Sequence, residues 1–448
     1  MIPHSTRPMT RLSMHAGAAA CAVLLSSPTA AQQRPAARPL GAAVVTSEAF
    51  SAISAVRPLP GGRVLLNDPG SHRVVLLDST LKILRVVADS TSATANAYGA
   101  RPGGLFAYHG DSTLFVDPSS LSMLVIDAEG KIVRIMAAPR PNDVGFLVGG
   151  TLGQPGLDAQ GRILYRTIGR PNLGGARPEP GKPFVMPPQP DTAPLVRFDL
   201  VARKLDTAAF VHIQPLRLNM VQTEGRVTMT NYINPLPVVD DWVVLPDGGL
   251  SIVRGHDYRV ETWNADGSHV VGEKVPFDWQ RLTDDDKSRI IDSSRTAMEA
   301  ARKGGTSGLS LSSGAPAAAS GEAPRMMVLT TTISSESGTN TTVGGPAPAN
   351  VSLPPLAFVQ PSELPDYRPA FASGATRADA AGRLWIRTNP TKPLAGGPEY
   401  DVLDRAGKLV DRVAIPRGAT IVGFGPGDVV YLGVRDAAGS HLVRARVR

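Results

Sequence analysis

The sequence predicts an all-β fold, a propeller of six four-stranded blades, and three observations lead to this prediction. The first is composition: 45 glycines and 40 prolines in 448 residues, 42% of them hydrophobic, indicate many turns around a large core. The second is a turn, usually centred on Gly, followed by an alternating apolar strand, which occurs six times. The third is a strand ending in Asp or Asn, a short turn and another strand, which follows the first five of these copies.

The six copies of the first pattern recur at the spacing expected of propeller blades. They lie at 59–66, 111–116, 158–165, 245–252, 379–386 and 425–432. Steps of 50 and 49 residues separate the first three copies, and a step of 45 residues separates the last two, while the longer steps between contain insertions. Four-stranded sheets that repeat every ~40–50 residues are typical of propellers.

The second pattern explains the hairpins and predicts how the ring closes. Its copies lie at 75–83, 125–132, 196–205, 261–267 and 402–409. Asp or Asn opens each turn through bonds to nearby backbone, and Gly supplies the positive φ of a tight turn. After Tyr431 only 441–447 can form a further strand, so the sixth sheet lacks its outer strand. We expect 42–46 to supply that strand, which joins both chain ends in one sheet and removes open edges.

With these patterns, the chain resembles six-bladed β-propellers of the NHL-repeat and TolB-like kind, including uncharacterised exported bacterial members. The resemblance covers residues 41–448 apart from the insertions. It implies the fold but no particular activity, because this fold hosts enzymes, receptors and scaffolds alike.

The N-terminus is predicted to be an export signal over residues 1–31. Two arginines form a positive region, an apolar run follows over 16–25, and small residues place cleavage near Ala31. The apolar run is shorter than the ~20 residues that span a bilayer, and no later segment is long enough. We therefore expect a periplasmic or secreted protein without a membrane span, which begins with a flexible linker over 32–40.

Composition also excludes several classes of function. Cys21 is the only cysteine and lies within the apolar run, so the mature chain has no disulfide and no thiolate metal site. Lipidation of Cys21 is the alternative, but Ala18 stands where a lipoprotein signal has a larger residue. Removing 1–31 lowers the net charge from +7 to +5, and no basic run suggests a nucleic-acid partner. We expect a monomer.

Two insertions interrupt the repeat. A Pro/Gly-rich loop over 169–194 belongs to blade three, and a longer insertion over 276–369 follows blade four. The longer one is predicted to contain a helix at about 283–302 and a disordered stretch at about 304–350, with 326–329 as a candidate strand. It is either a lid or partner-binding arm, or a surface insertion tolerated because loops absorb length at low entropic cost.

Candidate binding residues lie where the second strand of each blade ends. These ends share a face with the loops that enter the first strands, and propeller ligands usually bind there. The candidates are Asn67, Asp68, His72, Asp117, Arg166, Arg254, His256, Arg387, Asn389 and Arg435. The arginines suit a carboxylate, a phosphate or an acidic sugar, which they bind with paired hydrogen bonds. The alternative is structural, since Asp, Asn and Arg are common at strand ends. Asp240 and Asp241 are interpreted as a solvated strand start.

The sequence therefore predicts a binding module for a protein, a glycan or a small anionic ligand, without evident catalysis or cofactor. No metal, nucleophile or phosphate-loop motif occurs in the sequence. The alternative is a metal-dependent hydrolase or lactonase with its site at the central channel, where oxygen ligands would favour Ca²⁺. Gluconolactonase-type propellers use such a metal, but their ligand pattern does not match this sequence, so no metal ligand is assigned. A third interpretation is a scaffold that docks partners through 276–369.

Overall fold

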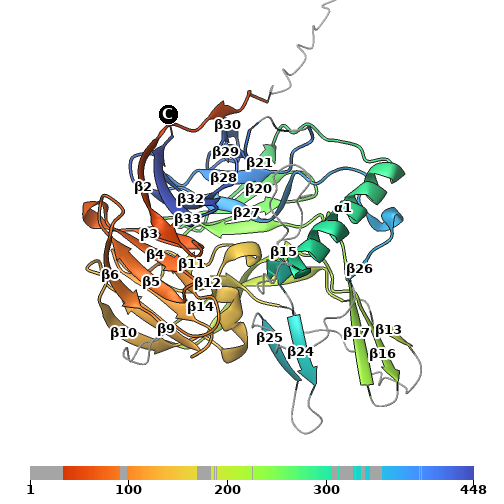
Figure 1. Ribbon diagram of the computed structural model, residues 1–448, viewed down its shortest axis with the longest axis horizontal. Helices are drawn as coiled ribbons and strands as arrows, with labels where there is room; N and C mark the ends of the chain where they lie inside the picture. Colours follow the sequence, from red (N-terminus) through yellow and green to blue (C-terminus); the bar gives the residue numbers. More distant parts are fainter. Residues whose placement is uncertain are drawn as a thin grey trace, which may run out of the picture. The chain divides into compact units, whose positions relative to one another are not determined.

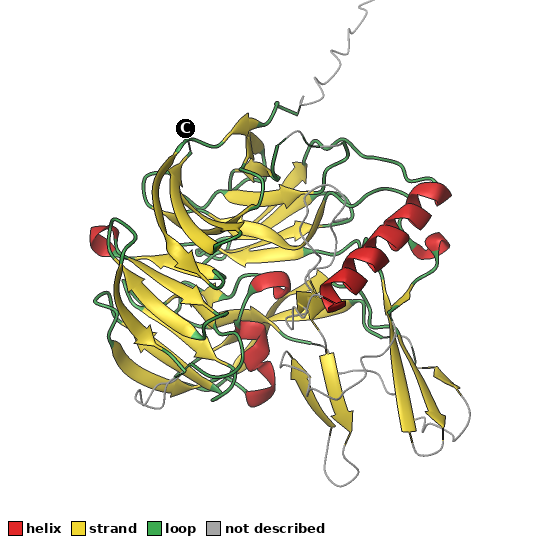
Figure 2. Cartoon of the chain, viewed as in Figure 1, coloured by secondary structure: helices red, strands yellow, loops and turns green. Residues whose placement is uncertain are grey.

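The structure, a computed structural model, is a six-bladed β-propeller (Figures 1 and 2), as the sequence predicts. It describes residues 34–90, 98–168, 183–185, 187, 189–223, 226–303, 310–311, 326–327, 329–333, 339–343, 356–392, 394 and 396–447. The predicted export signal lies outside these residues. The chain from Arg34 onward forms one compact unit.

Each blade is a four-stranded antiparallel sheet in chain order. Blade one contains β3 (Ala55–Pro58), β4 (Val64–Asp68), β5 (Arg73–Leu77) and β6 (Ile83–Ala88). Blade two contains β7 (Gly104–Ala107), β8 (Thr113–Asp117), β9 (Ser122–Ile126) and β10 (Ile132–Ala137). Blade three contains β11 (Gly156–Leu157), β12 (Ile163–Arg166), β14 (Thr192–Phe198) and β15 (Leu205–His212).

The second half of the ring repeats this order. Blade four contains β18 (Asp241–Val244), β19 (Leu250–Arg254), β20 (Arg259–Trp263) and β21 (His269–Lys274). Blade five contains β27 (Phe371–Ala378), β28 (Leu384–Thr388), β29 (Glu399–Leu403) and β30 (Leu409–Ala414). Blade six contains β31 (Ala419–Gly425), β32 (Val429–Asp436) and β33 (Gly439–Arg446). The first strands of successive blades contact one another, so they surround the central channel.

The ring closes with an N-terminal strand, as predicted. Strand β2 (Ala43–Phe50) pairs antiparallel with β33, with Ala43 opposite Ala445 and Phe50 opposite Ser440. Figure 1 shows this red strand beside the dark-blue strands at the end of the chain. Blade six therefore has four strands taken from both ends of the sequence.

The core lies between neighbouring blades. All five residues of β4 are buried, because its sheet is covered on both faces, whereas three of the six residues of β6 at the outer edge are exposed. Between blades one and two, Leu76 packs in one cluster with Phe115 and Leu124. The hairpin turns have the predicted chemistry: Asp158 accepts the backbone N–H groups of residues 160 and 162 at 3.0 and 2.9 Å. Equivalent bonds form at Asp127, Asp379 and Asp404.

The insertion after blade four contains the predicted helix, α1 (Asp284–Lys303), shown in red in Figure 2. Its Ile290, Ile291 and Met298 pack against Leu236 and Phe358. Further strands are β13 (Pro183–Val185), β16 (Leu218–Thr223), β17 (Arg226–Ile233) and β26 (Ala357–Phe358), which form one sheet. No helix among the described residues is long and apolar enough to cross a membrane.

The stretch predicted to be disordered, 304–350, contains four short strands. They are β22 (Ser310–Leu311), β23 (Met326–Met327), β24 (Leu329–Ile333) and β25 (Thr339–Val343). The candidate strand at 326–329 therefore falls on β23 and the start of β24. The other residues of this stretch lie outside the described residues.

The segment predicted as a flexible linker, 32–40, contacts blade five from Arg34 onward. Strand β1 (Arg38–Pro39) pairs parallel with β30, and the backbone N–H of Leu40 donates to Ala414 O at 2.9 Å. Hydrophobicity patterns give no signal for so short a strand. Its partner becomes available only when β30 takes its place in the sheet.

Candidate functional site

The candidate residues on blade one are buried and serve the local structure. The Nδ2 of Asn67 donates to the carbonyl oxygen of Gly103 at 2.8 Å, which links blades one and two. Asp68 accepts the backbone N–H of Ala52 at 2.9 Å and the Nε of Arg73 at 3.1 Å. Both side chains are fully buried, so neither is available to a ligand at the surface.

Three further candidates are also occupied by the fold. Asp117 accepts the backbone N–H of Ser120 at 3.2 Å in its own turn. Arg254 donates to Asp240 at 2.8 Å, and Asn389 donates to a backbone carbonyl at 2.9 Å. The structural interpretation of strand-end polar residues therefore holds for these positions. The expectation that Asp240 is solvated is wrong, because it is buried and accepts Arg254 and two backbone N–H groups.

His72, His256 and Arg435 make no side-chain hydrogen bond or ion pair with one another. His256 and Arg435 are exposed. His72 has a positive φ of 48°, and its ring packs edge-on against Tyr98 with centroids 5.6 Å apart. Its buried Nδ1 has no hydrogen-bond partner among the described residues. The contact with Tyr98 places the His72 ring at the junction of blades one and two.

Arg166 differs from the other candidates because its charge has little compensation. Its neighbours Tyr165 and Thr167 both donate to Asp143, at 2.7 and 3.2 Å, so strand alternation directs Arg166 to the other side of β12. Burial lowers the pKa of Arg166 to about 10, and the charge that opposes this shift is that of Asp241. Within the described residues Arg166 makes no ion pair or hydrogen bond through its side chain.

Asp241, which is buried, and Arg377, which like Arg166 is partly exposed, form one cluster with Arg166 at the channel. Asp241 is buried and accepts the backbone N–H groups of Gly374 at 3.1 Å and Thr376 at 2.7 Å, which corrects the expectation of a solvated strand start. Burial raises the pKa of Asp241, and the charge of Arg377 opposes that rise. Burial also lowers the pKa of Arg377, although Asp241 opposes this shift.

The fourth member of this cluster is the predicted candidate Arg387. Its charge lowers the pKa of Arg377 further, which is the sign of two like charges held close together. Arg166 and Arg377 each interact electrostatically with Asp241, and Arg387 interacts with Arg377. We call Arg166, Asp241, Arg377 and Arg387 the channel cluster. Sequence reasoning identified two of its arginines, but Arg377 lies within an inner strand and carries no strand-end signal.

A loop between blades two and three crosses the channel beside this cluster. Residues 149–153, the crossing segment, include the 3-10 turn η3 (Gly150–Leu152), which contacts β27 of blade five. Ser373 Oγ donates to the carbonyl oxygen of Thr151 at 2.6 Å, and Trp242 Nε1 donates to that of Leu152 at 2.9 Å. Gly374 has φ +75°, and a Cβ there would lie 2.6 Å from Gly150 O. Glycine permits this close approach.

Two surface pockets lie on the opposite face of the propeller. They have volumes of about 340 and 370 Å³ and share Pro426 and Val429 in the turn before β32. The first is also lined by Gly61 and Gly62 of the turn before β4, and the second by the turn before β28. Among the described residues, no three His, Cys, Asp or Glu side chains gather as a potential metal site.

No protein-family model matches the chain, and no curated protein is similar to it. Among solved structures, an inactive virginiamycin B lyase from Staphylococcus aureus with quinupristin is 10% identical, covering 91% of this chain and 98% of its own, with a TM-score of 0.37. Regucalcin, a calcium-binding protein from Agrobacterium tumefaciens, is 11% identical, and the match covers 93% of this chain and 98% of regucalcin with a TM-score of 0.37. A DUF4221 family member from Bacteroides vulgatus is 9% identical, and the match covers 91% of this chain and 97% of the other with a TM-score of 0.43. Values this low transfer no activity or residue role to this chain.

Proposed function

We propose that this chain is an exported binding protein for a small anion, which the channel cluster holds in the mouth of the propeller. The observation that carries the proposal is Arg166, a partly buried cation that lacks an ion pair within the described chain. Burying a charge without an ion-pair partner is costly, and the fold retains part of this cost at Arg166. A bound carboxylate, phosphate or sulfate would remove part of it.

The geometry favours a small anion over a glycan or a protein. The crossing segment occupies the channel beside the cluster, so a ligand that reaches Arg166 must fit around residues 149–153. Guanidinium groups bind oxyanions through two parallel hydrogen bonds, which a lysine cannot reproduce. We therefore expect a compact oxyanion, and the export predicted from residues 1–31 places the binding outside the cytoplasm.

The test is calorimetric titration of the mature protein with sulfate, phosphate and a uronic acid. Arg166→Gln is expected to weaken binding by roughly 10-fold or more, since hydrogen bonds to charged groups contribute ~1.5–3 kcal/mol. The matched control is Arg435→Gln, which removes an exposed arginine outside the cluster and should leave the affinity unchanged. Equal affinity in wild type and Arg166→Gln, or no binding of any probe, would overturn the proposal.

Stability offers an independent measure of the same site. Without ligand, Arg166→Gln is expected to keep or raise the thermal midpoint, because it removes a buried unpaired charge. Since burial lowers the pKa of Arg166 to about 10, anion binding should also weaken above that pH.

The metal-dependent alternative predicts lactone or ester hydrolysis that needs Ca²⁺ and stops with a chelator. That result would replace the binding function with a catalytic one.

A further inference from the structure

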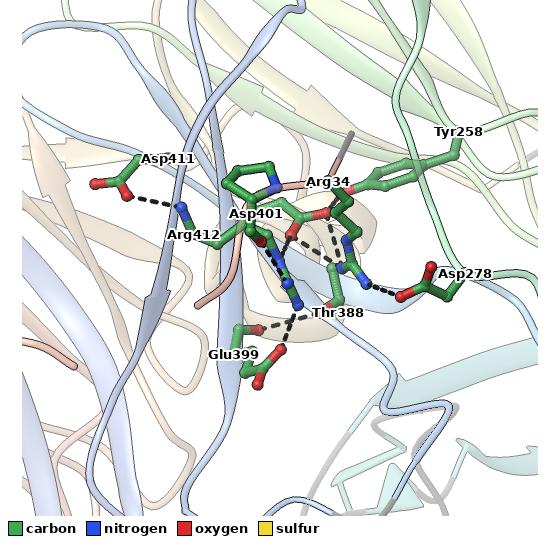
Figure 3. A network of polar contacts seen from close by, with 9 residues as sticks. Arg34, Tyr258, Asp278, Thr388, Glu399, Asp401, Asp411 and Arg412 are labelled. Carbon is green, nitrogen blue, oxygen red and sulfur yellow. Dashed lines mark hydrogen bonds and ion pairs between the residues drawn. The ribbon is translucent and has the colours of Figure 1, made fainter. Parts of the chain in front are cut away.

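A second polar network, made of other residues than the channel cluster, lies between blades four and five (Figure 3). Its centre is Asp401 on β29, whose side chain is fully buried. Asp401 accepts two hydrogen bonds from the Nη2 of Arg34, at 3.0 and 3.2 Å. It also accepts the Tyr258 hydroxyl at 2.9 Å and the Nε of Arg412 at 3.2 Å. One carboxylate therefore receives donors from three separate parts of the chain.

The surroundings of Arg34 match a guanidinium group on several sides. Its side chain is only 10% exposed, and its Cζ lies 4.8 Å from the centroid of the Phe277 ring, over the ring face. The carboxylate of Asp278 lies 3.5 Å from the Nη1. The two terminal nitrogens thus reach two different carboxylates, Nη2 at Asp401 and Nη1 at Asp278, while the Phe277 ring covers the guanidinium plane. A compact ammonium cannot make these contacts together, so they favour a planar guanidinium. We call Asp401, Tyr258, Phe277 and Asp278 the guanidinium clamp.

Asp401 and Tyr258 belong to blades five and four, and Phe277 and Asp278 to the start of the insertion after blade four, whereas Arg34 belongs to an N-terminal arm. The arm runs along blade five through β1 and then enters blade six as β2. Its other basic contact is Arg38 with Asp411, and both of these side chains are about one-third exposed. Arg34 is thus the deeply buried anchor of the arm, and Arg38 is a surface contact.

We propose that the clamp is a binding site for guanidinium groups and that Arg34 is its tethered ligand. The site does not depend on Arg34 for its shape, because Asp401 keeps the Tyr258 hydroxyl and Arg412 as donors when Arg34 is absent. The Arg412 side chain is in turn held by Glu399 at 2.5 Å. An arginine side chain, or a small guanidinium cation, can therefore enter the clamp once the arm no longer fills it.

The tether explains why a free ligand does not displace the arm. A ligand on a short linker has an effective concentration in the millimolar range or above, so Arg34 outcompetes dilute guanidinium groups. With cleavage near Ala31, as the sequence predicts, Arg34 is the third residue of the mature chain. The arm then contacts blade five through the third residue of the mature chain.

The test is chemical rescue of Arg34→Ala by N-ethylguanidinium. The variant is expected to unfold at a lower temperature than wild type, and millimolar N-ethylguanidinium should raise its midpoint by about 2 °C at ten times the dissociation constant. Ethylammonium at the same ionic strength should leave the midpoint of this variant unchanged. Wild type should not respond either, because Arg34 already fills the clamp. Arg34→Lys should recover little of the lost stability, since lysine lacks the planar fork.

Two further variants separate specific binding from general salt effects. Arg38→Ala removes an arginine from the same arm without emptying the clamp, so it should show no rescue. Asp401→Asn combined with Arg34→Ala should abolish rescue, because the carboxylate is lost. Equal responses to the two cations, or rescue of Arg38→Ala, would overturn the proposal. If Arg34→Ala does not fold alone, its refolding yield with each cation makes the same comparison.

Discussion

Tyr98 offers a sharp test of how the junction between blades one and two is held. Its side chain is 1% exposed, and its hydroxyl oxygen accepts the backbone N–H of Gly103 at 2.7 Å. The ring packs against His72 and against Phe115, with the latter centroid 4.8 Å away. Burial raises the pKa of Tyr98 from 10.0 to about 12. The phenol is therefore stable in the fold only in its neutral form.

Tyr98→Phe keeps the ring but removes the acceptor for Gly103. A buried backbone N–H without a partner costs ~1–3 kcal/mol, so the variant should be about 2 kcal/mol less stable at pH 7. Alkaline pH changes this comparison. A group whose pKa is higher in the folded state stabilises the fold fully below its unfolded pKa and loses that contribution as pH rises.

The size of the alkaline effect follows from the two pKa values. The pKa of Tyr98 is 10.0 in the unfolded chain and about 12 in the fold. The free energy of unfolding of wild type should therefore fall by roughly 1.4 kcal/mol between pH 7 and pH 11, whereas the phenylalanine variant loses nothing at this position. The difference between them should therefore shrink from about 2 to roughly 0.6 kcal/mol. Urea unfolding at pH 7, 10 and 11, followed by tryptophan fluorescence, measures this difference.

The control for this series is Tyr367→Phe, which removes a phenol from an exposed position. Its stability relative to wild type should be the same at pH 7 and pH 11. The reasoning would be refuted if the difference between wild type and Tyr98→Phe stayed constant across this range. A difference that grows with pH would equally contradict the stated direction of the Tyr98 shift.

Three other predictions test the crossing segment, the clamp and the insertion. Gly374→Ala should lower the free energy of unfolding by at least ~3 kcal/mol, because the new Cβ would meet the backbone oxygen of Gly150. Gly61→Ala has a similar φ but open space around it, so it should lower that free energy by only about 1 kcal/mol. Thermal unfolding of both variants measures the difference. Asp401→Ala should lower the free energy of unfolding in urea by ~3–5 kcal/mol, because it leaves buried donors unpaired. A loss below about 1 kcal/mol would argue against the network. Met298→Ala should destabilise the packing of α1 by ~2–5 kcal/mol. Proteolysis within the insertion should then be faster, while the propeller stays intact.

Local patterns in the sequence predicted the ring of blades correctly. The hairpin turns depend on residues close in sequence, such as Asp158 and the N–H groups two and four residues later. Strand β2 was also predictable, because the count of strands left blade six one short and the segment near Val44 supplies an alternating strand. The helix α1 followed from its spacing of apolar residues. These features were accessible because each depends on short-range backbone geometry and on burial periodicity.

The roles of the polar residues were decided only by the tertiary structure. Asn67 and Arg166 both end a second strand, yet one is bonded across a blade junction and the other lies in the channel cluster. Arg34 had no motif, and its carboxylate partner lies 367 residues away. A strand pattern determines which residues end a blade, but the partner of a buried charge depends on which distant segments meet there. For this chain, the sequence by itself therefore determined the six blades and their closure, and long-range packing decided which polar and charged side chains pair with one another.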